Sequence, residues 1–195
     1  LVIAAHEQRQ MAGLDIGSAF LEAGWIGEPV FMVIEKMLTT MLIHEYPELE
    51  PYRRSDGTLV VRLLKALYGT LIASKLWFDK LSGVLTRLGF VANELDTCVM
   101  NKTIKGNQLT VVIFVDDILA TSKDGESLTW LIDALAKEFD HVKGGIQTDF
   151  SYLGMHVKNK TADRVVEVSM EGYEDELLKY AKVTGVRKTP ATTNL

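Results

Sequence analysis

In Phe114-Val115-Asp116-Asp117-Ile118-Leu119, two adjacent carboxylates interrupt a run of residues that otherwise has the composition of a buried strand. Burial of both carboxylates without partners would cost roughly several kcal/mol of desolvation free energy. The pair must therefore lie in a turn, in water or on a cation. A hairpin turn is the structural explanation, because Asp is favoured in turns. A cation site is the functional one.

A third carboxylate, Asp15, stands near the end of another apolar segment, residues 11–16, far upstream in the chain. If the two strands ended side by side, Asp15 would lie near Asp116, and the carboxylates would repel each other by about a few kcal/mol at about 4 Å. A hard divalent cation removes that repulsion, and ligation by oxygen alone favours Mg²⁺ or Mn²⁺. Paired metal ions of this kind serve in-line phosphoryl transfer in polymerases and nucleases. The residues thus predict a candidate metal site.

Helical and strand-like segments follow one another along the chain without an internal repeat or a linker, which favours one α+β domain. Strands are expected at residues 11–16, 29–34, 59–63, 98–104, 108–115, 118–121, 150–157 and 164–170. Helices are expected at residues 19–23 with Ser18 as N-cap, and at 35–46, 73–88, 125–139 and 173–182. The helix at 73–88 places Trp77, Leu81, Val84, Leu85 and Leu88 on one face. We expect Trp77 to belong to the core.

Composition excludes several classes of protein. The chain has 195 residues, of which 47% are hydrophobic and 24% are charged, so disorder and low complexity are excluded. A single cysteine, Cys98, excludes a disulfide framework and fits a reducing compartment. The apolar run at residues 111–115 is too short to span a bilayer, so no membrane partner is expected.

Charge is unevenly distributed. The net charge is −5, which argues against a nonspecific nucleic-acid binder, yet residues 51–80 carry six basic and two acidic side chains. A solvated surface would explain this segment, and so would a surface that contacts nucleic-acid phosphates. The six basic residues are Arg53, Arg54, Arg62, Lys65, Lys75 and Lys80.

Five motifs, in order, resemble those of one family of enzymes. The segment from Asp15 to Leu21 resembles the first catalytic motif of reverse transcriptases, and Phe114-Val115-Asp116-Asp117 resembles their aromatic-x-Asp-Asp motif. The remaining three resemble blocks of copia-type LTR retrotransposons: Lys65-Ala66-Leu67-Tyr68-Gly69 with Leu76-Trp77-Phe78, then Asp96-Thr97-Cys98, then Ser151-Tyr152-Leu153-Gly154. Over roughly residues 10–175, the chain therefore resembles a copia-type reverse transcriptase.

The resemblance implies roles for individual residues. Asp15, Asp116 and Asp117 would be the catalytic, metal-binding triad, and the backbone carbonyl of Ile16 would help to hold the nucleotide-bound metal. Two Mg²⁺ ions are implied as cofactors, with Mn²⁺ as a substitute. Phe20 would be a steric gate against the 2′-hydroxyl, although core packing explains it equally simply.

Further roles follow from the same resemblance. Tyr68 and Gly69 would form part of the nucleotide pocket. Phe114, Leu153 and Gly154 would position the primer, although Phe114 is equally well explained as a plain strand residue. The six basic residues of the 51–80 segment would contact the nucleic-acid backbone. One departure from the family is Thr70 to Lys75, where the usual lysine, glutamine and proline are absent.

The resemblance also implies an architecture: a polymerase palm, an antiparallel sheet with helices on one face, carrying partial fingers over residues 1–195. We expect the chain to be a piece that lacks most of the fingers, the thumb, the connection and the RNase H region. The start at Leu1 fits an excised piece. Such a fragment need not be active alone.

The expected function is RNA-directed DNA synthesis, in which dNTPs are transferred to a primer 3′-hydroxyl. The expected partners are an RNA or DNA template with its primer, dNTPs, and the rest of the Pol polyprotein, including integrase and RNase H. The expected location is intracellular, in a cytoplasmic virus-like particle. One alternative is an inert, element-derived nucleic-acid-binding or scaffold domain. A phosphate-binding signalling domain is a third class, but the expected early double-acid strand end is missing.

Overall fold

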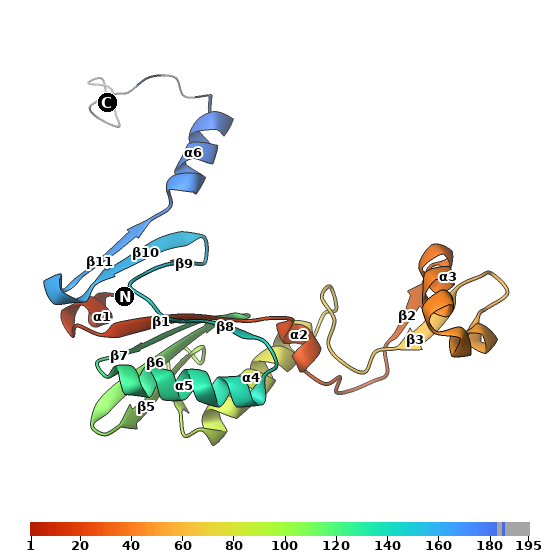
Figure 1. Ribbon diagram of the computed structural model, residues 1–195, viewed down its shortest axis with the longest axis horizontal. Coiled ribbons are helices and arrows are strands. Elements are labelled where there is room, and N and C mark those ends of the chain that lie inside the picture. The colour runs from red at the N-terminus through yellow and green to blue at the C-terminus, as the bar shows by residue number, and fades with distance from the viewer. Residues whose placement is uncertain (183–184, 186–195) are drawn as a thin grey trace.

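A six-stranded antiparallel sheet forms the centre of the molecule (Figure 1). The computed structural model describes residues 1–182 and 185; the last residues of the predicted domain, 183–184 and 186–195, lie outside the described residues. In spatial order the strands are β4 (Val91–Ala92), β5 (Val99–Ile104), β6 (Asn107–Phe114), β7 (Asp117–Ser122), β1 (Gln10–Ile16) and β8 (Val142–Ile146).

Two amphipathic helices, α4 (Ala73–Arg87) and α5 (Gly125–Glu138), cover one face of this sheet (Figure 1). Their apolar residues recur every three to four positions, so each helix has one apolar side to bury. The predicted apolar face of α4 is buried at Trp77, Leu81, Val84 and Leu85, and Leu88 is partly buried. The predicted combination of helices with an antiparallel sheet is confirmed, and α4 and α5 share one face of it.

A second, three-stranded antiparallel sheet and α1 (Val2–His6) lie over the opposite face. Its strands are β9 (Asp149–Tyr152), β10 (Met155–Lys160) and β11 (Val165–Ser169); a short turn of 3-10 helix (Thr161–Asp163) precedes β11, and α6 (Glu171–Tyr180) follows it. Met11 and Leu119 of the large sheet pack there against Phe150, Tyr152 and Val157.

The single strand expected at 150–157 is wrong, because the chain reverses at Leu153-Gly154. Both residues have positive φ angles, +51° and +74°. Two consecutive residues of this kind form the tight hairpin turn that the twist of antiparallel strands favours. The result is a hairpin of β9 and β10 in which Tyr152 faces Met155.

A smaller unit extends away from the large sheet (Figure 1). It consists of β2 (Phe31–Ile34) paired with β3 (Leu59–Arg62), together with α3 (Lys36–Glu45) and a 3-10 helix (Pro47–Tyr52). Ile34, Ile43 and Leu59 form its small core. The short helix α2 (Ala19–Glu22) follows β1 and packs beside α4.

Two local expectations need correction. Ser18 precedes α2 but adopts a left-handed conformation, and its side chain makes no capping hydrogen bond. Strand β8 was not expected, because Lys143-Gly144-Gly145 has no apolar alternation. Gly144 has a φ of +101°, and a Cβ there would lie 2.1 Å from the carbonyl oxygen of Gly13. Only glycine therefore allows β8 to approach β1 so closely.

No helix in residues 1–182 is long and apolar enough to cross a membrane, and the longest helix of that region, α4, has 15 residues.

A hydrogen bond from a buried side chain of α4 holds the turn between β6 and β7. Trp77 is 1% exposed, and its indole N–H donates a 2.6 Å hydrogen bond to the carbonyl oxygen of Val115. Val115 has a φ of +53°, which is costly for a β-branched residue. The Trp77 and Phe139 rings pack in an edge-to-face arrangement, with their centroids 5.3 Å apart. Helix packing thus stabilises a turn that its own sequence disfavours.

We predict that Trp77→Phe lowers the free energy of unfolding by about 2 kcal/mol, because it removes the donor and leaves a small cavity. Trp130→Phe is the matched control, since Trp130 is 36% exposed and stacks on Phe90 near the surface. Urea denaturation measures both. Equal losses in the two variants would show that the hydrogen bond to the turn adds nothing.

Candidate active site

Pairing of β1 with β7 brings the three predicted carboxylates to one end of the large sheet. Asp15 lies opposite Asp117 in the antiparallel register. Asp116 occupies the turn between β6 and β7, and its carbonyl oxygen accepts a 3.1 Å hydrogen bond from the backbone N–H of Ile16. Asp116 therefore lies in a hairpin turn, as the structural explanation expects, and Asp117, the first residue of β7, lies opposite Asp15.

The charges of this cluster are not compensated by the surrounding protein. Among the described residues, none of the three carboxylates forms an ion pair or accepts a side-chain hydrogen bond. Burial raises the pKa of Asp117, and the neighbouring charges of Asp116 and Asp15 raise it further. The carboxylates are therefore close enough to repel one another.

Oxygen donors of this kind suit a hard divalent cation. In residues 1–182, however, no group of three or more His, Cys, Asp or Glu side chains is arranged as a ready-made metal site. The donor chemistry of Asp15, Asp116 and Asp117 fits such an ion, whereas their side chains do not surround a common point.

An aromatic pair adjoins the carboxylates on the side of α2. The rings of Phe20 and Tyr68 pack with their centroids 4.3 Å apart. Burial raises the pKa of the Tyr68 hydroxyl, and the negative charges of Asp116 and Asp15 raise it further. Gly69 follows with a φ of +88° and forms part of a turn. The three predicted nucleotide-pocket residues thus lie together, next to the acids.

Phe20 has a second set of contacts. It is partly buried and packs against the main core as well as against a small cluster around Ala23 and Ala66. Helix α2 is held to α4 by Lys80, whose Nζ donates to the backbone oxygen of Glu22 at 2.6 Å and forms an ion pair with its carboxylate. Phe20 therefore packs against the core and is also a partly exposed neighbour of the acids.

The residues expected to position the primer lie on two hairpins. Phe114 is the last residue of β6, faces Asp117 across the ladder and is exposed. Leu153 and Gly154 form the turn of the β9–β10 hairpin, over the opposite face of the large sheet from α4 and α5. Tyr152, at the end of β9, lines one cavity together with Asp15 and Asp117.

The six basic residues of the 51–80 segment do not form one strip. Arg53, Arg54 and Arg62 belong to the outer unit of β2 and β3, whereas Lys75 and Lys80 lie on α4, and Lys65 forms a bridge with Gly24. Three of them are engaged within the chain, in the ion pairs Arg53–Glu50, Lys75–Asp79 and Lys80–Glu22. A basic neighbour of the acids that the sequence did not indicate is Lys143, which faces Asp15 across the β1–β8 ladder.

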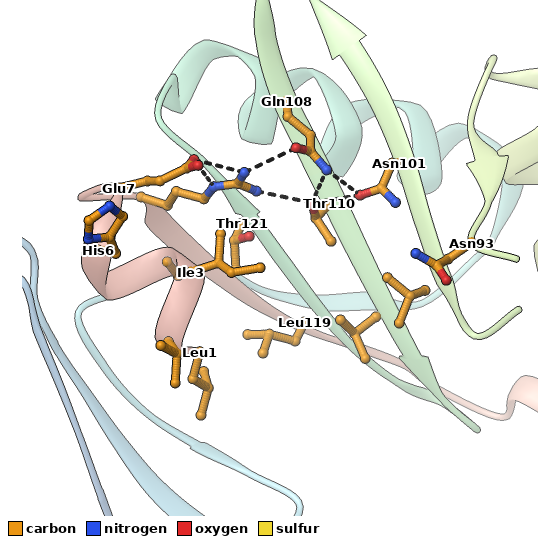
Figure 2. A pocket seen from close by; sticks show the side chains of 15 residues that line it. Leu1, Ile3, His6, Glu7, Asn93, Asn101, Gln108, Thr110, Leu119 and Thr121 are labelled. Atoms are coloured by element: carbon orange, nitrogen blue, oxygen red, sulfur yellow. Dashed lines mark hydrogen bonds and ion pairs between the residues drawn. The ribbon is translucent and has the colours of Figure 1, made fainter. Parts of the chain in front are cut away.

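A larger cavity of about 590 Å³ lies elsewhere, between α1 and the large sheet, and includes none of the predicted site residues (Figure 2). Its polar wall is built on Arg9, which is 4% exposed. The Arg9 guanidinium donates hydrogen bonds to Glu7, Gln108 and Thr110. Asn101 Oδ1 accepts from Gln108 and Thr110, and Figure 2 marks the contacts of this network with dashed lines. The network therefore connects the end of α1 to the large sheet.

Comparison with known proteins assigns the chain to a family. A family model described as "Reverse transcriptase (RNA-dependent DNA polymerase)" matches residues 1–193. The Retrovirus-related Pol polyprotein from transposon RE2 of Arabidopsis thaliana is 27% identical over 179 residues, which cover 87% of this chain and 11% of the relative. The corresponding polyprotein from transposon TNT 1-94 of Nicotiana tabacum is 27% identical over 181 residues, covering 92% and 12%.

A third relative, the polyprotein from transposon RE1 of Arabidopsis thaliana, is 30% identical over 134 residues, covering 69% of this chain and 9% of its own length. The aligned segment of the chain thus spans 9% to 12% of the length of these curated relatives. Because the family model covers almost the whole sequence, the resemblance of the motifs is confirmed: the chain belongs to the copia-type reverse transcriptase (RNA-dependent DNA polymerase) family.

Proposed function

We propose that this chain is the nucleotidyl-transferring part of an RNA-directed DNA polymerase, which adds dNTPs to a primer 3′-hydroxyl. One observation carries the proposal. Asp15 stands opposite Asp117 at the end of two paired strands, with Asp116 in the adjoining turn, and none of the three is neutralised by a described side chain. Nothing in the packing of the sheet requires three acids there, and their mutual repulsion costs stability.

The donors that would hold two Mg²⁺ ions, or Mn²⁺ in their place, are Asp15, Asp116, Asp117 and the backbone carbonyl of Ile16. Such ions would favour ionisation of the primer 3′-hydroxyl and neutralise the triphosphate. The protein contributes position: the β1–β7 register sets Asp15 against Asp117, and the Trp77 hydrogen bond holds the turn that carries Asp116. Fixed geometry of this kind supplies a large share of catalysis in phosphoryl transfer.

Substrate selection is assigned to the aromatic pair. The Phe20 and Tyr68 rings are in contact beside the acids, and Phe20 is held from behind by the core. A rigid ring at the sugar would exclude a 2′-hydroxyl by steric clash, which is selectivity built from repulsion. Gly69 would let the backbone approach the nucleotide.

The proposal extends to the partners. An RNA or DNA template with its primer would lie over the face that carries Asp15 and Asp117, and Arg54, Arg62 and Lys65 are the basic residues of the predicted set without a described ion-pair partner. We also propose that the chain acts as a palm with partial fingers within a Pol polyprotein that supplies integrase and RNase H. A cytoplasmic virus-like particle is the proposed location.

We predict that Asp116→Asn abolishes primer extension by a reverse transcriptase that contains this chain, because it removes a ligand charge without changing core volume. Asp133→Asn, on the exposed side of α5, is the control and should extend normally. Extension of a labelled primer in Mg²⁺ measures both. Wild-type extension by Asp116→Asn would rule out the catalytic assignment.

The same substitution has a second expected effect in metal-free buffer. Asp116 helps to raise the pKa of Asp117, so repulsion between the two carboxylates destabilises the folded state at neutral pH. Asp116→Asn should therefore raise the thermal midpoint at neutral pH, and the gain should vanish as the pH falls through the raised pKa of Asp117, because protonated Asp117 carries no charge for residue 116 to repel.

We predict that Phe20→Ala admits ribonucleotides, with at least a tenfold loss in discrimination, which corresponds to about 1.4 kcal/mol in relative barrier. Leu21→Ala, one position along the same helix and 40% exposed, is the control. Single-nucleotide incorporation with dNTPs and rNTPs gives the ratio. If Phe20→Ala lowers stability and leaves that ratio unchanged, Phe20 is a core residue only.

A further inference from the structure

Helix α2 follows the strand of Asp15 and carries Phe20, yet it is too short to be stable by itself. It has four residues, and the side chain of Ser18 makes no capping hydrogen bond to it. An isolated helix of this length does not persist in water, because one turn fixes many dihedral angles for very few hydrogen bonds. The position of the Phe20 ring beside the acids therefore depends on contacts that other elements make with α2.

Both ends of the α2 segment are bonded to neighbouring backbone. The N–H of Gly17, before the helix, donates to the carbonyl oxygen of His141 at 2.8 Å. The carbonyl oxygen of Ala23, after the helix, accepts a hydrogen bond from the N–H of Ala66 at 2.9 Å. These bonds fix where the segment begins and ends, and side chains must hold the turn between them.

Lys80 holds that turn from α4, which lies beside α2 (Figure 1). Its ammonium donates to the carbonyl oxygen of Glu22 at 2.6 Å and lies 3.1 Å from the Glu22 carboxylate. The last carbonyls of a helix have no partner within the helix, so Lys80 caps α2 from another helix. The ammonium also lies 5.2 Å from the centroid of the Phe139 ring, within the range of a cation–π contact.

Glu22 connects this contact to a third element. Its other carboxylate oxygen accepts a 3.5 Å hydrogen bond from the backbone N–H of Asp140, which lies just after α5. The Glu22 side chain is 15% exposed and that of Lys80 is 33% exposed. An ion pair buried to this extent adds little net stability over apolar packing, because desolvation of the two charges offsets their attraction. Its contribution is a defined geometry, which joins α2, α4 and the end of α5.

We propose that Lys80, through Glu22, is a positioning residue for sugar selection, which holds α2 so that the Phe20 ring cannot move away from a 2′-hydroxyl. The inference rests on the proposed function, because it needs Phe20 to act as the gate. Selection by steric repulsion works only if the repelling group stays in place. Tyr68 supports the ring itself, with 4.3 Å between the centroids, and Lys80 supports its helix. Lys80 then acts within the protein, and the role at the nucleic-acid backbone that the resemblance implies for it does not apply.

Single-nucleotide incorporation with dNTPs and rNTPs, by a reverse transcriptase that contains this chain, tests the proposal. Lys80→Met keeps an unbranched apolar side chain but removes the charge and the donor. It should lower the ratio of kcat/KM for dNTP to kcat/KM for rNTP about fivefold, a factor that corresponds to the net free energy of one hydrogen bond. The main change should be a lower KM for rNTP. Lys80→Arg, which keeps a cationic donor, should retain most of the ratio.

The matched control is Arg87→Met, in the last turn of the same helix. Arg87 also forms an ion pair with another helix, at 2.8 Å from Glu138 of α5, but both side chains are exposed. This variant should leave the ratio unchanged. If Lys80→Met yields too little folded protein, the double variant with Glu22→Gln removes the pair without leaving a carboxylate unpaired, and it should show the same lowered ratio.

A double-mutant cycle shows whether Lys80 acts through Phe20. In the Phe20→Ala background, Lys80→Met should change the ratio no further, because the ring that it positions is gone. An equal factor in both backgrounds would overturn the proposal, since Lys80 would then act on the substrate independently of the ring. A lower kcat for both substrates with an unchanged ratio would make Lys80 a structural residue only.

The outcomes also separate this inference from the function on which it rests. A wild type that extends no primer contradicts both. If Phe20→Ala lowers the ratio and Lys80→Met does not, the gate stands and the role of Lys80 is contradicted. If Phe20→Ala leaves the ratio unchanged, there is no gate for Lys80 to position, and only the polymerase function survives.

Discussion

The hydrogen bond from the Trp77 indole to the Val115 carbonyl is the contact on which the candidate site depends. Val115 is a β-branched residue with a positive φ, so the turn between β6 and β7 is unfavourable on its own. The buried helix α4 compensates from behind, and the backbone of Ile16 binds the carbonyl of Asp116 from the side. A helix, a hairpin and a neighbouring strand thereby fix one acidic turn.

The cost of this arrangement is concentrated around the acids. Three carboxylates without described cationic partners, a strained valine and an unpaired Tyr152 hydroxyl all lie at one end of the sheet. The helix-covered face is ordinary by comparison, with an apolar core that runs from α4 to α5. Deviations of this kind gather where a protein binds its ligands, because the ligands supply the missing partners.

Much of the fold and of the candidate site could be predicted from the sequence, and the features that were missed have physical explanations. The helices α4 and α5 follow from apolar periodicity, and the order of five motifs indicates the family. The hairpin at Leu153-Gly154 was missed because Leu153 is an apolar residue that also suits a strand, and only Gly154 indicates a left-handed turn. The remaining features depend on strand pairing. The β1–β7 register places Asp15 opposite Asp117, although we expected Asp116, and the β1–β8 register places Lys143 opposite Asp15.

The central proposal is that Asp15, Asp116 and Asp117, placed by the β1–β7 register and the Trp77-supported turn, are the donors that bind a divalent cation. Titration of the chain with Mn²⁺, followed by electron paramagnetic resonance of the free ion, tests this most directly. The wild type should bind Mn²⁺ saturably, Asp15→Asn and Asp117→Asn should bind it at least tenfold more weakly, as expected for loss of a charged ligand, and Trp77→Phe should fall between them. Equal Mn²⁺ affinity in the wild type and Asp15→Asn would contradict the account.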